Sequence, residues 1–191
     1  MNTSKMKIDL CVEYYEQTVS KLLAEYQQQG QGVTRNSCGE MYERLAKMLM
    51  LSADDTLDIR KNDYMTIKSD SGLYSLNNVQ VDWHVYKNND LKLIVECKTY
   101  LDVCYLKRAV DDFETIRKKY PNVPAVIFTG QNAVGKNAWG YYNEMYDFET
   151  FVVNQTKRRS SKNPIYKTKD NLDLVEVNNF VNHVKGLLNV N

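Results

Sequence analysis

Two stretches of alternating apolar and polar residues, 79–86 and 91–98, constrain the fold of this chain most strongly. Successive side chains of a strand point to opposite faces, so each stretch predicts a strand with one apolar and one polar face. The residues between them, 87–90 (KNND), are typical of a hairpin turn. The sequence therefore predicts an antiparallel hairpin with one buried face. The first strand is expected to place Val79, Val81, Trp83 and Val85 on one face and Gln80, Asp82, His84 and Tyr86 on the other.

Glu96 and Lys98 share the polar face of the second strand, because they are two positions apart. Opposed residues of an antiparallel pair share a face, which leaves two registers for the hairpin. A three-residue loop, 88–90, puts Asp82 opposite Glu96, whereas a five-residue loop puts Asp82 opposite Lys98 and His84 opposite Glu96. A two-residue loop would oppose residues of different faces, and we reject it. In the first register the Cβ atoms of Asp82 and Glu96 would lie about 4.5–5.5 Å apart, close enough to bind one cation together.

Helices and further strands surround this hairpin along the chain. Apolar residues at helical spacing predict helices at 6–28, 37–51, 103–120 and 172–188, with Asn36 and Ser37 as capping residues of the second. Strands are expected at 57–67, 125–129 and 148–153, and an irregular connection at 130–146. This order of elements predicts an α/β (α+β) fold with a mixed sheet.

The charge of the chain is concentrated in one segment. The 25 Lys and Arg residues nearly cancel the 24 Asp and Glu residues, and the net charge of +1 gives no overall sign of nucleic-acid binding. Residues 155–169, however, contain six cations and no acid, which leaves 19 cations against 24 acids elsewhere. Clustered cations favour phosphate binding, because each neutralised phosphate releases counterions. The candidates for such contacts are Lys157, Arg158, Arg159 and Lys162.

Cysteine spacing and the first residues of the chain indicate its compartment. The four cysteines form no CxxC pair and are far in sequence from both histidines, so we expect free thiols and no zinc site. Residues 1–9 mix charges without the apolar stretch of a secretory leader, and no apolar run approaches the roughly 20 residues of a membrane span. We therefore expect a cytoplasmic protein with no membrane segment.

The carboxylates of the hairpin indicate a magnesium site. Two carboxylates on one rigid hairpin suit Mg²⁺, which takes oxygen ligands and keeps several waters. We expect Asp82 and Glu96 to bind it, with the backbone carbonyl of Cys97 as a third ligand and Mn²⁺ as a substitute metal. A lysine beside the metal, here Lys98, can position an attacking water and offset charge on a phosphorane-like transition state.

The residues VQVD at 79–82, followed after thirteen residues by ECK at 96–98, resemble the PD-(D/E)XK nuclease motif. In that superfamily the Asp and the Glu bind divalent metal and the Lys assists the water nucleophile. The resemblance therefore implies these catalytic roles for Asp82, Glu96 and Lys98. Val81 stands where the motif has Pro, a loosely kept position of the superfamily.

The order of elements agrees with the same resemblance. The usual core of the superfamily is α-β-β-β-α-β, and residues 37–129 predict that order. Many members carry a further Glu on the preceding helix, and GEMYE at 39–43 resembles that element, which points to Glu43 first and Glu40 second. The resemblance implies one nuclease domain, 1–191, with a restriction-endonuclease-like core at 36–130. A helical extension, 1–35, precedes this core, and 131–191 follow it with the basic loop and a terminal helix.

The flanking helices make the chain resemble small type II restriction endonucleases in particular. The resemblance implies Mg²⁺-dependent, sequence-specific hydrolysis of double-stranded DNA by a homodimer in a prokaryotic cytoplasm, with a partner methyltransferase. It also leaves two alternatives, a structure-specific nuclease such as a Holliday junction resolvase and a DNA-binding subunit without catalysis. The candidate DNA contacts are Lys157, Arg158, Arg159, Lys162 and His84.

Overall fold

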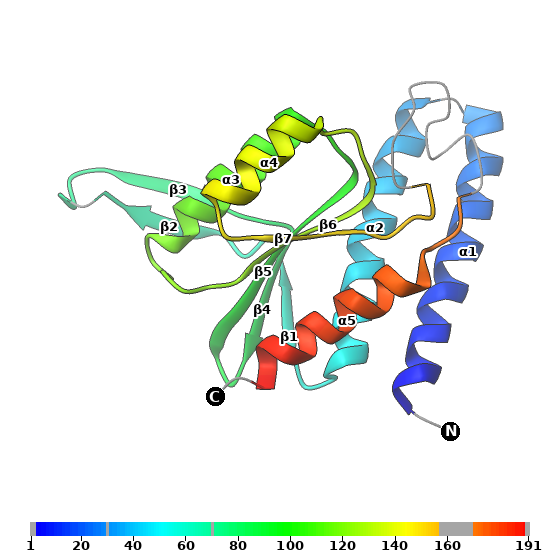
Figure 1. Ribbon diagram of the computed structural model, residues 1–191, viewed down its shortest axis with the longest axis horizontal. Helices are drawn as coiled ribbons and strands as arrows, with labels where there is room; N and C mark the ends of the chain where they lie inside the picture. Colours follow the sequence, from blue (N-terminus) through cyan, green and yellow to red (C-terminus); the bar gives the residue numbers. More distant parts are fainter. Residues whose placement is uncertain (1–2, 30, 70, 157–169, 190–191) are drawn as a thin grey trace.

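A five-stranded mixed sheet forms the centre of the molecule (Figure 1). Its spatial order is β1 (Asp58–Lys61), β4 (Trp83–Lys87), β5 (Asp90–Leu101), β6 (Ala125–Asn132) and β7 (Glu149–Val152). The pairs β1–β4 and β4–β5 are antiparallel, and the pairs β5–β6 and β6–β7 are parallel. The computed structural model describes residues 3–29, 31–69, 71–156 and 170–189. Within them the predicted α/β (α+β) fold with a mixed sheet is confirmed.

Helices cover both faces of this sheet (Figure 1). α1 (Thr3–Gln29), α2 (Gln31–Ala53) and α5 (Leu174–Asn189) pack on one face, and α3 (Val103–Arg117) and α4 (Lys136–Met145) lie on the other. The sequence explains α3 directly, because Asp102 caps it by accepting a hydrogen bond from the backbone N–H of Tyr105 at 2.9 Å. Leu106, Val110 and Phe113 recur at helical spacing on its buried side. The sheet therefore lies between two apolar cores.

Three element boundaries differ from the prediction. α2 begins at Gln31, so Asn36 and Ser37 lie inside the helix and do not cap it. The segment 130–146, expected to be irregular, contains α4. The single strand expected at 57–67 is divided at Asn62 into β1 and β2 (Met65–Lys68), because the positive φ of Asn62, 49°, takes the chain out of the extended conformation. The core order α-β-β-β-α-β is present as α2, β1, β4, β5, α3 and β6.

A two-stranded hairpin, β2 with β3 (Ser75–Val79), projects from the body as a separate antiparallel sheet (Figure 1). We call residues 64–80 the arm. Val79 and Val81 are buried in the core beside α3, whereas Trp83 and Val85 are buried in the core beside α1 and α2. The prediction that these four side chains share one face of one strand is therefore wrong. The chain leaves the arm and changes face before β4 begins.

The hairpin of β4 and β5 has a two-residue turn, the loop length that the alternation of the sequence led us to reject. Lys87 pairs with Asp90, and Asn88 and Asn89 occupy the turn with φ of 54° and 65°. Two consecutive positive φ angles are what a type I′ turn requires, and Asn tolerates them better than most residues. The rejection was wrong because it assumed an unbroken register along the whole hairpin.

A β-bulge restores the register that the apolar pattern demands. The pairs on its two sides are Tyr86 with Leu91 and Val85 with Leu93. One extra residue of β5 is therefore accommodated between them, which shifts the pairing by one position. Continued past Trp83, paired with Val95, this register brings Asp82 opposite Glu96. The two-residue turn and the bulge together thus give the register that we had expected from a three-residue loop.

Two chemical features of the whole chain can be stated. Its four cysteines, Cys11, Cys38, Cys97 and Cys104, are free thiols. No helix within the described ranges is long and apolar enough to cross a membrane.

Candidate active site

Three charged side chains meet where the arm joins the central sheet. Asp82 lies between β3 and β4, while Glu96 and Lys98 belong to β5 and share one face of it. The backbone N–H of Asp82 donates a hydrogen bond to Glu96 Oε2 at 3.3 Å. The backbone N–H of Cys97 donates one to Asp82 Oδ2 at 2.7 Å. These two bonds join the segments directly and hold the Asp82 and Glu96 carboxylates side by side.

The Lys98 ammonium lies beside both carboxylates. It forms an ion pair with Glu96 Oε1, and its Nζ lies 3.9 Å from Asp82 Oδ2. The side chains of Lys98 and Asp82 are each 20% exposed and that of Glu96 is 8% exposed, so the cluster is shielded but open to solvent on one side. Lys98 Nζ also lies 5.9 Å from the centre of the Tyr105 ring on α3. The structure therefore brings together the three residues that the motif singled out.

Burial controls the protonation of this cluster. Burial and the Glu96 carboxylate raise the pKa of Asp82 to about 6, although Lys98 and the Cys97 N–H act to lower it. Burial lowers the pKa of Lys98, but the charges of Glu96 and Asp82 outweigh burial and raise it overall. Two shielded carboxylates that repel each other favour a bound cation, because a cation relieves the repulsion. In this structure the Lys98 ammonium supplies that positive charge.

Glu43, the further carboxylate implied by the resemblance, pairs with a different lysine. Its Oε2 lies 2.7 Å from Nζ of Lys61, the last residue of β1. The interaction with Glu43 raises the pKa of Lys61, and the Lys61 charge in turn acts to lower the pKa of Asp82. The backbone N–H of Asn62 donates a hydrogen bond to the Asp82 carbonyl at 3.3 Å. The end of β1 is thereby held against Asp82, and Lys61 stands at the edge of the site.

A hollow of about 490 Å³ opens beside Glu43. Its lining includes Glu40, Glu43, Arg44, Lys47, Lys61 and Trp83. The Trp83 indole N–H donates a hydrogen bond to the backbone carbonyl of Glu43 at 3.0 Å, and Lys47 Nζ lies 5.1 Å from the indole centre. Glu43 and Lys61 thus both line this hollow. Sequence reasoning missed Lys61, since no periodicity relates a residue on β1 to one on α2.

The donor set fits Mg²⁺ through oxygen ligands. Asp82 and Glu96 supply two carboxylates, and the Cys97 carbonyl lies on the strand between Glu96 and Lys98. Among the residues that the structure describes, no three His, Cys, Asp or Glu side chains are grouped to hold one metal ion. Glu43 is therefore not part of a preformed ligand set, but Mg²⁺ commonly uses one or two carboxylates and completes its shell with water. Burial raises the pKa of the Cys97 thiol well above its usual range, so the thiol remains a protonated core group.

The predicted DNA contacts differ in outcome. His84 is fully buried, and burial lowers its pKa. Neither of its ring nitrogens has a hydrogen-bond partner in the described part of the chain. The expectation of a surface histidine in contact with DNA is wrong, because β4 is an interior strand of the sheet and is covered on both faces. The other candidates, Lys157, Arg158, Arg159 and Lys162, lie outside the described residues.

Comparison with known proteins gives partial similarities. No protein-family model matches the chain. Over 70 residues, 37% of this chain, the sequence is 33% identical to the type II restriction enzyme DdeI of Desulfomicrobium norvegicum, and this stretch covers 28% of that enzyme. The chain is also similar to the solved structure of protein AF1548, described as of unknown function, with a TM-score of 0.39, 13% identity and coverage of 66% of this chain and 63% of that one. The native BbvCI A2B2 tetramer gives a TM-score of 0.36 and 12% identity, covering 95% of this chain and 91% of that one.

Proposed function

We propose that this protein is a Mg²⁺-dependent endonuclease that hydrolyses phosphodiesters of double-stranded DNA at specific sequences, in the manner of a type II restriction enzyme. The observation that carries the proposal is the convergence of Asp82, Glu96 and Lys98 at one shielded position. The identity of 33% with a type II restriction enzyme over 70 residues supports a nuclease-like activity. That stretch covers 28% of the relative. The cofactor, the substrate and the partners of this protein are therefore part of the proposal.

The residues of the site divide the chemistry between them. Asp82, Glu96 and the backbone carbonyl of Cys97 would hold Mg²⁺, which supplies positive charge to polarise the scissile phosphate. The carboxylate charges raise the pKa of Lys98, so its ammonium stays protonated at neutral pH. Lys98 therefore orients the attacking water by donating hydrogen bonds and stabilises the negative charge of the transition state. Glu43 is the candidate further carboxylate, and Lys61 holds it at the edge of the site.

A homodimer on a two-fold DNA site is the proposed working assembly, because two-fold symmetry presents the same surface to each half-site. The six cations of residues 155–169 are the proposed phosphate contacts. A methyltransferase that protects the host sequence is the proposed genetic partner. The homodimer, the phosphate contacts and the methyltransferase together complete the proposed restriction system.

Digestion of a long DNA of known sequence tests the activity. Wild-type protein with Mg²⁺ should produce discrete fragments whose sequenced ends share one short sequence, whereas EDTA should prevent cutting. Selective cutting of a four-way junction, without discrete fragments from linear DNA, would favour a junction resolvase. Binding of DNA without cutting of any substrate would favour the non-catalytic subunit. Either result would overturn the proposed restriction activity.

A further inference from the structure

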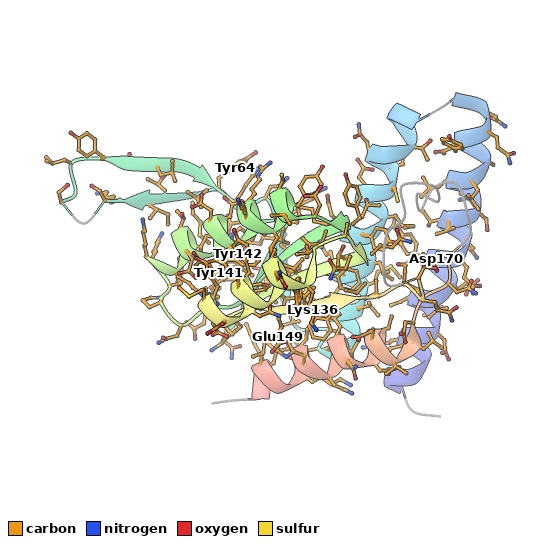
Figure 2. The ribbon with its side chains drawn as sticks, turned by 45° about the horizontal axis from the view of Figure 1, so that its top comes forward. Tyr64, Lys136, Tyr141, Tyr142, Glu149 and Asp170 are labelled. Atoms are coloured by element: carbon orange, nitrogen blue, oxygen red, sulfur yellow. The ribbon has the colours of Figure 1, made fainter. Side chains whose placement is uncertain are left out.

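The arm exposes large apolar side chains at its far end. Leu73 is 79% exposed and Tyr74 is 76% exposed, and both lie in the turn between β2 and β3. Leu76 on β3 and Tyr64 are 58% and 63% exposed. Figure 2 shows Tyr64 where the arm leaves the body and shows the turn at the far end, away from the central sheet. Apolar side chains clustered on a surface often mark a site that a partner covers.

Hydrogen bonds join the described residues of the turn, Ser69 and 71–74. The backbone N–H of Ser69 donates to the Tyr74 carbonyl at 2.8 Å, and the N–H of Gly72 donates to the Ser69 carbonyl at 2.8 Å. The Ser69 hydroxyl accepts from the Tyr74 N–H at 3.2 Å, and the Ser71 hydroxyl accepts from the Leu73 N–H at 3.3 Å. Gly72 takes a φ of 69°, which glycine adopts without strain. These bonds favour one arrangement of Leu73 and Tyr74 at the tip.

The base of the arm is anchored in the protein core. Met65, Ile67 and Val79 are buried on the α3 side of the sheet, so that half of the arm cannot move independently of the body. Where the arm begins, Asp63 accepts a hydrogen bond from the Tyr86 hydroxyl at 2.8 Å. The arm then leads through Gln80 into the Asp82 segment of the candidate active site. Whatever the tip binds is thus placed at a set distance from Asp82.

The charge of the arm indicates which part of DNA it suits, the base edges in a groove or the phosphates of the backbone. From residue 64 to 80 the sequence has one cation, Lys68, and one acid, Asp70. A surface that binds phosphates needs many cations, whereas base edges can also be contacted by hydroxyl side chains and by apolar groups that meet the thymine methyl. The arm carries the exposed hydroxyl residues Ser71 and Ser75 beside its apolar tip. Its composition therefore suits the floor of a groove.

The distribution of exposed apolar residues argues against a second copy of the chain as the partner. The other large apolar side chains that are well exposed in the described ranges lie on α1, α4 and α5, and they are Leu10, Tyr141, Met145, Leu174 and Val175. A stable protein interface buries about 800 Å² on each partner. The narrow tip of a hairpin supplies little area by itself, so the tip suits a narrow groove better than a flat protein surface.

The dimensions of the arm agree with this partner. The major groove of DNA, about 12 Å wide and about 8.5 Å deep, accepts a two-stranded ribbon, and the five residues of β3, about 17 Å long, exceed its depth. Apolar side chains can also insert between base pairs and open the stack. We propose that the β2–β3 arm enters a groove of the duplex whose backbone lies at Asp82, Glu96 and Lys98, and that Leu73 and Tyr74 contact its bases. This proposal rests on the proposed DNA endonuclease function, and it assigns recognition of the DNA sequence to the arm.

Sequence selection from a random duplex library tests the arm without requiring cleavage. The test variant carries Leu73→Ser and Tyr74→Ser, and the matched control carries Leu174→Ser and Tyr141→Ser, which remove the same residue types from exposed positions on α5 and α4. Each protein binds the library with Ca²⁺ in place of Mg²⁺, and the bound DNA is sequenced. Wild type and control should enrich one short sequence, and the arm variant should lose at least about tenfold of that enrichment. Binding of unselected DNA should change little, because the arm contributes few phosphate contacts.

Several results would overturn the proposal. They are full enrichment by the arm variant, no enriched sequence with the wild type, and a loss of dimer by the arm variant alone in sedimentation without DNA. The last result would assign the tip to a second copy of the chain. Equal melting temperatures of the two variants would exclude misfolding as the cause of lost enrichment. If the wild type enriches a sequence that the arm variant loses, yet cuts no DNA, the endonuclease function fails and the arm proposal is supported.

Discussion

The two lysine–carboxylate pairs of this protein differ in how the fold supports them. Lys98 projects from β5 in the middle of the sheet, its side chain is 20% exposed, and it lies beside Glu96 and Asp82. Lys61 ends the edge strand β1, its side chain is 48% exposed, and it pairs with Glu43. Water and salt screen an exposed pair far more than a shielded one. Lys98 is thus a shielded lysine and Lys61 an exposed one, although the Glu43 side chain, 20% exposed, is as shielded as that of Lys98.

This difference separates a fixed part of the site from an adjustable part. Asp82 and Glu96 are joined through backbone hydrogen bonds, so their distance changes little when a ligand binds. Glu43 and Lys61 line the hollow beside Trp83, and the Lys61 side chain is 48% exposed. We therefore expect substitutions in the central cluster to have large effects on catalysis and substitutions at the edge to have small ones.

The largest expected effect follows from Lys98→Met, which keeps the length of the side chain and removes its charge. Cleavage of a specific duplex with Mg²⁺ should become slower by at least about 100-fold, since the transition state loses a positioned charge. The initial rate of product formation measures this effect. A rate close to that of the wild type would place water activation on another residue.

The same variant permits a check that does not depend on activity. Without Lys98, the Asp82 and Glu96 carboxylates repel each other with no neighbouring ammonium, so the metal-free protein should melt at a lower temperature than the wild type. Added Mg²⁺ should raise the melting temperature of Lys98→Met by more than it raises that of the wild type. An equal shift for both proteins would mean that the two carboxylates do not bind the metal.

A smaller effect is expected at the edge of the site from Lys61→Met. This change frees Glu43 but leaves the central cluster intact, so the cleavage rate should fall by about tenfold or less. Lys47→Met is the matched control, because Lys47 lines the same hollow but lies over the Trp83 ring. The control should cut at the wild-type rate. If the cleavage rate fell as far for Lys61→Met as for Lys98→Met, the two lysine–carboxylate pairs would not differ in their effect on catalysis.

The same contrast shows which parts of the site the sequence could predict. Glu96 and Lys98 are two positions apart on one strand, and the period of a strand alone requires them to share a face. The apolar pattern then limited the place of Asp82 to two registers, and the observed pairing of Trp83 with Val95, continued by one residue, agrees with the one that puts Asp82 opposite Glu96. The bulge that produces this register was not predictable, because one inserted residue, Lys92, leaves the apolar pattern of β5 readable as regular alternation.

Contacts between distant elements were beyond reach for a different reason. The Glu43–Lys61 pair joins α2 to β1, and its existence depends on how the helix packs on the sheet. The burial of His84 likewise depends on the elements that cover β4, since its position in the alternation predicts a polar face. The arm was not predicted: its ends were assigned to the strands 57–67 and 79–86, and residues 75–78 of β3 lack the apolar alternation that would have indicated a strand. Local sequence patterns thus predicted helices and strands, whereas the pairing of Glu43 with Lys61 at the edge of the site depended on tertiary packing.

The smallest expected effect concerns the electrostatics of the central cluster and is measured as stability. Burial and Glu96 raise the pKa of Asp82 from 3.8 to about 6, so the folded protein keeps a proton that the unfolded chain releases between those values. The stability that this proton provides is present at low pH and is lost as the pH rises through about 6. Asp82→Asn cannot lose it, so the variant should gain a few degrees in melting temperature relative to the wild type as the pH is raised without metal. Calorimetry of both proteins between about pH 4.5 and about pH 7.5 measures this difference. A constant difference across that range would mean that Asp82 is ionised throughout, and that Lys98 neutralises the central carboxylates as fully as Lys61 neutralises Glu43.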